Sequence, residues 1–242
     1  MDSRFRYIGV DGCRSGWFYV GLDSNLSGAS GILPAIREID DVADENTIVM
    51  IDIPIGLKEK DTQERACDTE ARKLLKKRSS SIFPAPSRMA LAADDYPAAS
   101  RINAECTGRK LSMQTYHILH KIREVDDFIF SGAKKIGLRE FHPELGFLAL
   151  NNFNPLAYSK KHKKGRLERL KILETYFRQA PEILQKALDR FLRKQVAADD
   201  ILDAAAGAVT ALLRDRLVSL PHTPEYDSRG LKMEIVYPAV EP

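Results

Sequence analysis

The stretch YIGVDGCRSGWFYVGL, residues 7–22, decides the fold of this chain. Its two apolar runs are separated by the short segment 12–16, which predicts two strands joined by a tight turn. Asp11 ends the first run, where a carboxylate removed from water needs partners. Gly9, on the same strand face, and Gly12 are expected to leave room beside Asp11 for a phosphate or a metal ion. Asp before Gly is also a common turn signal, so a local turn role for Asp11 stays open at this point.

The composition is that of a folded protein with a substantial core. The chain has 242 residues, of which 44% are hydrophobic and 29% charged, and its net charge is +3. This small positive charge permits a nucleic-acid partner without requiring one. The three cysteines lie far apart with no CxxC spacing, which argues against a zinc cluster or disulfide framework. With no signal-peptide pattern and no apolar run of membrane-spanning length, we expect a cytoplasmic protein without a membrane partner.

A second apolar segment also carries an aspartate. Residues 47–57, TIVMIDIPIGL, have apolar side chains on both faces, which is typical of a strand covered on both sides in an α/β protein. Asp52 lies two residues before Pro54, which marks the end of the strand. Ligands bind at the carboxyl ends of the strands in open α/β sheets, so Asp11 and Asp52 are candidates for one site. The alternative for Asp52 is a structural role in bonding local amides.

The last helical segment is almost entirely apolar and contains three aspartates near its start. Small residues recur along 198–217, so we expect this helix to be buried closely against a sheet. Asp199 or Asp200 is expected to cap it, and Asp203 follows one turn after Asp200 on the same side. Elsewhere the sequence pattern predicts strands at 31–39, 135–141 and 231–237, and helices at 61–77, 87–106, 111–129, 167–177 and 180–193.

Three charged or polar residues cluster around Pro143. Glu140 lies late in the predicted 135–141 strand, as Asp52 does in its own strand. Glu144 follows Pro143 at a predicted helix start, where a negative charge suits the helix dipole, so a structural role is favoured. His142 is expected to cap or pack rather than to act as a base.

One segment concentrates positive charge. Residues 158–171, YSKKHKKGRLERLK, hold seven cations, including Lys160, Lys161, Lys164 and Arg166, against a single acid. Lysines this dense repel one another unless they are solvated or opposed by a polyanion, and both interpretations stay open. Further candidates for substrate binding are Arg65, Arg72 and Arg78, on or just after the predicted 61–77 helix.

The acids define the predicted chemistry. Asp11, Asp52, Asp200 and Asp203, with Glu140 as a fifth, fall at strand ends or at a helix start. Brought together, several carboxylates would raise one another's pKa values, and divalent cations would remove that conflict. Oxygen ligands select Mg²⁺ or Mn²⁺ rather than zinc, and two such ions roughly 3.5–4 Å apart stabilise both oxygens in phosphodiester hydrolysis. The four aspartates are therefore predicted metal ligands, and all five acids are predicted catalytic residues.

Several motifs, taken in order, resemble a known family. They are IGVDGCRSGW (8–17), IDIPIGL (51–57), ACDTEAR to RSSSIFPAP (66–86), EFHPE (140–144), KKHKKGR (160–166) and DDILDA (199–204). Together they resemble domain-of-unknown-function family 429, usually described as predicted nucleases with a ribonuclease H-like fold. The resemblance covers about residues 6–237.

The resemblance implies an α/β fold with a ribonuclease H-like, three-layer mixed sheet that begins as an antiparallel meander. It implies one domain over 1–242, with a helical insertion at about 58–134. It also implies acids at the ends of the first and fourth strands and in the C-terminal helix, which are Asp11, Asp52 and the pair Asp200 and Asp203. Glu140 does not match the first-helix glutamate of ribonuclease H proper.

The leading expectation is a Mg²⁺- or Mn²⁺-dependent nuclease, an enzyme that hydrolyses DNA or RNA. One alternative is a nucleotide-phosphate binding or phosphotransfer protein of the same fold class. Such proteins duplicate the fold, and a 242-residue chain with one hairpin of the Asp11 type leaves little room for a second copy. Another alternative is a non-catalytic nucleic-acid-binding protein. The sequence leaves open whether the chain forms an oligomer.

Overall fold

The computed structural model describes residues 5–131 and 136–239, which form two compact units. Unit 1 comprises Met1–Asp52, Gly132–Val218 and Val236–Pro242, and unit 2 comprises Ile53–Ser131 and Ser219–Ile235. Most of the insertion predicted at 58–134 falls in unit 2, while residues 132–134 lie outside the described residues. No helix in the described part of the chain combines the length and apolar character needed to cross a membrane.

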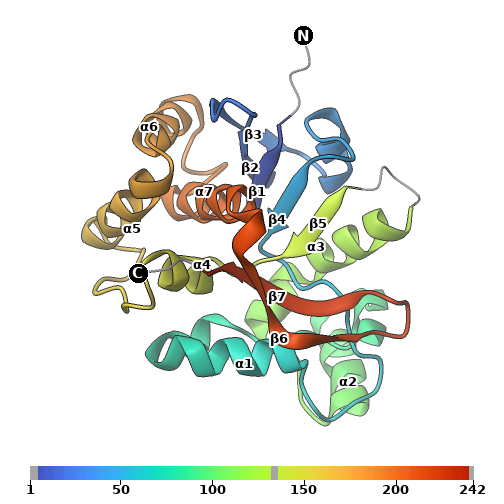
Figure 1. The fold of residues 1–242 in the computed structure, drawn as a ribbon. Helices are drawn as coiled ribbons and strands as arrows, with labels where there is room; N and C mark the ends of the chain where they lie inside the picture. Colours follow the sequence, from blue (N-terminus) through green and yellow to red (C-terminus); the bar gives the residue numbers. More distant parts are fainter. Residues whose placement is uncertain (1–4, 132–135, 240–242) are drawn as a thin grey trace. The chain divides into compact units, whose positions relative to one another are not determined.

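Unit 1 contains a five-stranded mixed sheet in the order β3-β2-β1-β4-β5 (Figure 1). Its strands are β1 (Tyr7–Cys13), β2 (Gly16–Leu22), β3 (Gly28–Leu33), β4 (Ile48–Ile51) and β5 (Gly137–Glu140). The first three pair antiparallel, whereas β4 pairs parallel with β1 and with β5. The turn between β1 and β2 requires Gly16, whose φ of +121° is unfavourable for other residues. The predicted α/β fold with a meander leading into a mixed sheet is confirmed.

Helix α7 (Ala198–Leu212) packs on the sheet over β1 through bare backbone. A Cβ added at Gly9 would lie 2.0 Å from the carbonyl oxygen of Ala204 and 2.2 Å from the amide nitrogen of Ala208. The predicted close approach of this helix to the sheet is therefore correct. The prediction that Gly9 leaves space for a phosphate or metal ion is wrong, because the α7 backbone fills that space.

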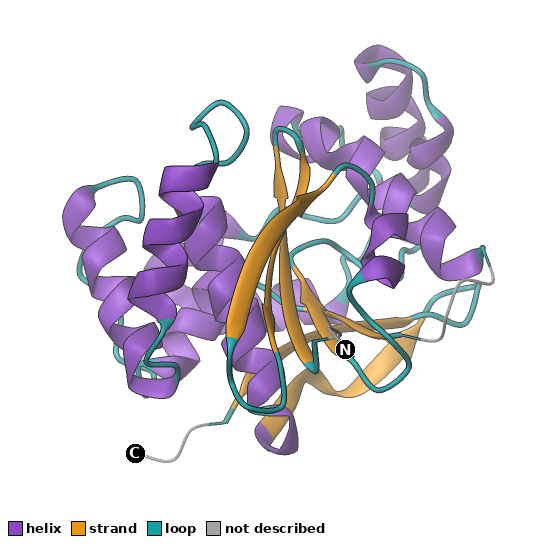
Figure 2. Cartoon of the chain, turned by 90° about the horizontal axis from the view of Figure 1, so that it is seen from above, coloured by secondary structure: helices purple, strands orange, loops and turns teal. Residues whose placement is uncertain are grey.

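Three more helices of unit 1 surround α7: α4 (Pro143–Leu150), α5 (Lys163–Tyr176) and α6 (Ala180–Arg190). Together they form a helical layer against the sheet (Figure 2). One buried cluster joins the sheet to these helices. It includes Phe18 and Met50 from the strands, Phe147 from α4, Leu173 from α5 and Val209 from α7. This apolar core holds α7 in place and so fixes the aspartates near its start.

Unit 2 contains α1 (Ala66–Leu75), α2 (Tyr96–Thr107) and α3 (Met113–Phe130), with the short 3₁₀ helices η2 (Lys76–Ser81) and η3 (Arg88–Ala92). Asp95 and Ser112 cap α2 and α3 by accepting backbone N–H groups, which explains where these helices begin. Strands β6 (Leu217–Tyr226) and β7 (Lys232–Pro238) form a separate two-stranded sheet, most of which belongs to unit 2.

Several element boundaries differ from the sequence predictions. The strand predicted at 31–39 ends at Leu33, and the 3₁₀ helix η1 (Ile36–Asp41) follows Pro34. The strand predicted at 47–57 ends at Ile51. The helix predicted at 198–217 ends at Leu212. Strand β6 was missed altogether, because its prolines and polar residues obscure the apolar alternation. Lys135, the first residue of the strand predicted at 135–141, lies outside the described residues.

Candidate active site

Three neighbouring strands each deliver one acid at their carboxyl end. Parallel pairing sets Val10 of β1 beside Ile51 of β4, and Asp11 follows Val10 directly. The amide of Asp52 donates to the carbonyl of Val10 at 3.1 Å, which extends this pairing by one residue. Glu140, the last residue of β5, pairs with Ile51 and is 5% exposed. The sheet thus presents Asp11, Asp52 and Glu140 on adjacent strands.

Helix α7 adds two aspartates from the helical layer. Asp203 is 3% exposed and lies in the second turn of α7. Asp200 is partly buried, and its carboxylate accepts the backbone N–H of Ala197 at 2.9 Å. The helix cap is therefore Ala197, and the prediction that Asp199 or Asp200 is the cap is wrong. Asp200 uses one oxygen to hold the first turn, whereas Asp203 is buried within the helical layer.

Burial and mutual charge shift the pKa values of these aspartates. Burial raises the pKa of Asp11 well above its usual value, and the charges of Asp52, Asp203 and Asp200 add to the rise. Burial, and then the charge of Asp203, raises the pKa of Asp52 to about 8. Burial raises the pKa of Asp203 to about 6 although the charge of Lys160 opposes it. Burial also raises the pKa of Asp200. We call Asp11, Asp52, Asp200 and Asp203 the acid cluster.

Lys160 pairs with the acid cluster. Its ammonium donates to Oδ2 of Asp203 in an ion pair, and its side chain is 30% exposed. Burial alone would lower the pKa of Lys160, but the charges of Asp203, Asp11 and Asp52 raise it. The other carboxylate oxygen of Asp203, Oδ1, is buried and accepts no hydrogen bond. Sequence reasoning placed Lys160 among the substrate-binding cations and missed this ion pair.

A second buried ion pair supports the site. Arg169 is fully buried and donates to Oε1 of Glu144 at 2.7 Å. Its guanidinium also donates to the carbonyls of Tyr158 at 3.2 Å and Gly165 at 3.1 Å, and lies over the ring of Phe147. The charge of Glu144 reaches the acid cluster, because it helps to raise the pKa values of Asp52 and Asp203. Glu144 thus lies in the first turn of α4, as predicted, and its charge also acts on the acid cluster.

The place of Arg169 in the basic segment suggested that it is part of an exposed basic surface. The structure shows instead that it is buried. A signal for its burial was present in the sequence. Gly165, Arg169 and Leu173 recur every four residues and form the buried face of α5. An arginine on such a face needs an internal carboxylate.

The remaining cations of the basic segment face solvent. Lys161, Lys163 and Lys164 are exposed, and they precede or begin α5. Lys164 lies over the ring of Tyr158, and Arg166 donates to the carbonyl of Lys161 at 2.9 Å. The first turn of α5 has no acidic residue, although negative charge is favoured there. This end of α5 is an unusually positive surface.

The three other predicted substrate-binding arginines lie in unit 2. Arg65 is 3% exposed, and its guanidinium pairs with Asp68 at 2.5 Å and donates to the carbonyl of Ile55 at 3.1 Å. Arg72 pairs with Glu64. Arg78 is partly buried in η2. Arg65 and Arg72 are thus engaged with carboxylates of unit 2, Asp68 and Glu64.

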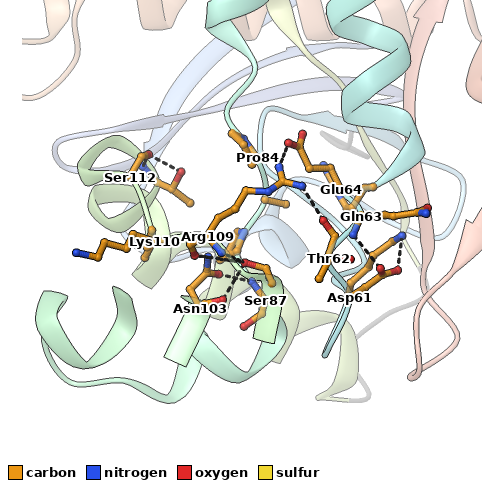
Figure 3. A pocket seen from close by; sticks show the side chains of 17 residues that line it. Asp61, Thr62, Gln63, Glu64, Pro84, Ser87, Asn103, Arg109, Lys110 and Ser112 are labelled. Carbon is orange, nitrogen blue, oxygen red and sulfur yellow. Dashed lines mark hydrogen bonds and ion pairs between the residues drawn. The ribbon is translucent and has the colours of Figure 1, made fainter. Parts of the chain in front are cut away.

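Unit 2 also contains a pocket of about 90 Å³ beside Arg65 (Figure 3). Its polar side chains are engaged with one another. Arg109 pairs with Glu64, and the Asn103 side chain accepts the N–H of Ser87 at 2.8 Å and donates to the carbonyl of Arg109 at 2.8 Å.

The acid cluster fits a hard divalent cation by its chemistry. Among residues 5–131 and 136–239, no three His, Cys, Asp or Glu side chains are already arranged to share a metal ion. The donors are all carboxylate oxygens, which suit Mg²⁺ or Mn²⁺. Oδ1 of Asp203 accepts no hydrogen bond. The pKa values of buried Asp11 and Asp203 and of partly buried Asp52 are raised, and the charge of Lys160 offsets this rise only in part.

Fold and site together define an α/β protein with acidic side chains near the C-terminal ends of the parallel strands β1, β4 and β5. A family model described as "Protein of unknown function (DUF429)" matches residues 9–226, and the chain belongs to this family. The family predicted from the sequence motifs is therefore confirmed. No curated protein and no solved structure gives a significant match to the chain.

Proposed function

We propose that this protein is a metal-dependent phosphodiesterase that cleaves DNA or RNA. The observation that carries the proposal is the convergence of Asp11, Asp52 and Asp203 from two strands and a helix. Each is largely buried, and each has a raised pKa. Groups of this kind are uncommon outside functional sites, because keeping several carboxylates together away from water is costly.

In this mechanism Asp11, Asp52 and Asp203 would hold Mg²⁺ or Mn²⁺. When bound, the cation would supply Lewis-acid activation of water and neutralise charge on the phosphate. Asp11, Asp52 and Asp203 would release to solvent any protons held on their carboxyl groups. Asp200 holds the first turn of α7 through its bond to Ala197 and contributes its charge to the site. Glu140 lies close enough to Asp52 to raise its pKa and is the fifth candidate acid.

The positive end of α5 provides the substrate-binding surface in this proposal. Lys161 and Lys164 are exposed, and Arg166 is partly exposed beside them. These side chains belong to the same segment as Lys160, which contacts the acid cluster. A phosphate backbone bound along this segment would pass close to the carboxylates. Phosphate contacts of this kind carry no sequence information, so the proposed substrate class is nucleic acid without sequence preference.

The experiment is a cleavage assay of the purified protein with Mn²⁺ or Mg²⁺ on single- and double-stranded DNA, RNA, hybrids and junctions. We expect metal-dependent cleavage of at least one substrate, with activity abolished by EDTA and by Asp11→Asn. Asp215→Asn is the matched control, because the Asp215 side chain is 90% exposed on a 3₁₀ turn, and it should retain wild-type activity.

Absence of cleavage on the whole panel with both metals would contradict the proposal. Turnover of ATP in the same preparation would favour the phosphotransfer alternative. Salt-sensitive binding that survives Asp11→Asn without cleavage would favour a non-catalytic nucleic-acid-binding protein.

A further inference from the structure

Hydrogen bonds to its backbone hold the loop that carries Lys160, while the Lys160 side chain pairs with Asp203 of α7. Glu168 accepts the backbone N–H groups of Ala157 at 2.7 Å and Tyr158 at 3.1 Å. Arg169 holds the carbonyls of Tyr158 and Gly165. These bonds anchor the loop to α5 at both ends. The Lys160 side chain can therefore change its position by rotating about its own bonds, without moving the loop.

Lys160 contributes one positive charge to a cluster of four aspartates. It pairs directly with Oδ2 of Asp203, and its charge also acts on Asp11, Asp52 and Asp200. Yet Oδ1 of Asp203, on a side chain only 3% exposed, still accepts no hydrogen bond. A monovalent ammonium thus occupies one oxygen of a carboxylate that has a second, unused oxygen. A divalent cation would compensate more charge and could engage that oxygen as well.

We propose that Lys160 is the resident counter-cation of the acid cluster, and that a divalent metal ion displaces its ammonium from Asp203 and frees it to contact a substrate phosphate. This inference rests on the proposed metal site and adds its regulation. The Lys160–Asp203 pair keeps the carboxylate compensated before the metal ion binds. Since two cations repel one another at such short range, the same lysine weakens metal binding and leaves its place when the ion enters.

The first test measures Mn²⁺ affinity by calorimetry for the wild type, Lys160→Met and Lys171→Met. Methionine keeps much of the length of the lysine side chain and removes its charge. Because a competing charge is lost from the site, Lys160→Met should bind Mn²⁺ about tenfold more tightly, or better. Lys171 is exposed on α5, so Lys171→Met controls for the change in net charge and should stay within about twofold of the wild type. Unchanged or weaker binding by Lys160→Met would overturn the inference.

The second test needs no variant and therefore does not depend on the folding of Lys160→Met. The wild-type protein is labelled with an amine-reactive reagent in EDTA and in saturating Mn²⁺, and each lysine is quantified by mass spectrometry. The pair with Asp203 should protect Lys160 in EDTA, and Mn²⁺ should increase its labelling severalfold, while labelling of Lys171 stays constant. Equal labelling of Lys160 in both conditions would overturn the inference.

These outcomes separate the inference from the proposed function. If Lys160→Met binds Mn²⁺ more tightly and the wild-type protein cleaves no nucleic acid, the cation exchange is supported and the nuclease is contradicted. If the wild-type protein shows metal-dependent cleavage and Lys160→Met leaves the Mn²⁺ affinity unchanged, the nuclease is supported and the cation exchange is contradicted. Failure of Mn²⁺ to bind any of these proteins would overturn both.

Discussion

A Cβ placed on Gly207 of α7 would lie 2.9 Å from the Cα of Gly9 in β1, so this helix and strand touch without intervening side chains. Asp11 lies two residues after Gly9, and Asp203 lies one helical turn before Gly207. The contact therefore sets how close the strand acid and the helix acid come to each other. Any side chain at Gly9 would push α7 off the sheet.

The first prediction follows from this contact. Gly9→Ala should destabilise the protein by about 3 kcal/mol or more, because the added methyl group would overlap backbone atoms that cannot rotate away. Gly230→Ala is the control, since Gly230 has a φ of +81° with no atom within 4 Å of the added Cβ. It should cost only about 1 kcal/mol of backbone strain. Urea unfolding measures both, and equal losses would show that the α7 contact is not tight.

The second prediction concerns the buried pair of Arg169 and Glu144. Arg169→Met removes the guanidinium that pairs with the buried Glu144 carboxylate and should cost about 3–5 kcal/mol in the free energy of unfolding. The double variant Arg169→Met, Glu144→Gln should recover a good part of that loss, because the uncompensated charge is gone. A double-mutant cycle from urea unfolding gives the coupling between the two side chains. Additive losses would mean that the pair is not coupled.

The third prediction is a pH dependence of stability in EDTA. Burial and neighbouring charge raise the pKa of Asp52 from 3.8 to about 8 in the folded state. The folded protein therefore binds this proton more tightly than the unfolded chain, so the stabilisation is present at low pH and is lost as pH rises toward 8. The free energy of unfolding should fall by more than about 1 kcal/mol between pH 5 and pH 8.

Asp52→Asn tests the origin of this slope. The variant cannot titrate at this position, so its free energy of unfolding should depend less on pH over the same range. Saturating Mn²⁺ should also reduce the loss of wild-type stability at pH 8, because a bound cation stabilises the ionised carboxylates. A slope that Asp52→Asn leaves unchanged would assign the pH dependence to other groups.

The fourth prediction addresses the positive end of α5. Replacing both Lys161 and Lys164 by Met should weaken nucleic-acid binding and reduce the slope of log affinity against log salt by roughly 2. Lys186→Met is the control, because Lys186 is 72% exposed on α6 and pairs with Glu182. Fluorescence anisotropy at several salt concentrations in EDTA measures binding without cleavage. An unchanged slope would place the substrate elsewhere.

The fold could be predicted from the sequence where local pattern and tertiary structure agree. The apolar runs of 7–22 gave β1 and β2, and the small residues of 198–217 indicated a helix against the sheet. Asp11 and Asp52 were candidates because each follows an apolar run. Strand β6 was missed, since Pro221 and Pro224 interrupt its pattern.

The ion pairs of the site could not be predicted in the same way. Lys160 and Asp203 are 43 positions apart, and Glu144 and Arg169 are 25 apart. Their pairing depends on how α4, α5 and α7 pack, and not on local spacing. The sequence could not predict what packs against Gly9, because a missing side chain can make room for a ligand or for another backbone.

The guanidinium of Arg169 has one further consequence. It holds the carbonyls of Tyr158 and Gly165, so the residues between them begin and end on the same buried group. A loop closed at its base in this way can change length at its tip at a small entropic cost. Residues 159–162, which lie between Tyr158 and the start of α5, should therefore tolerate a change of length that leaves Arg169 paired with Glu144.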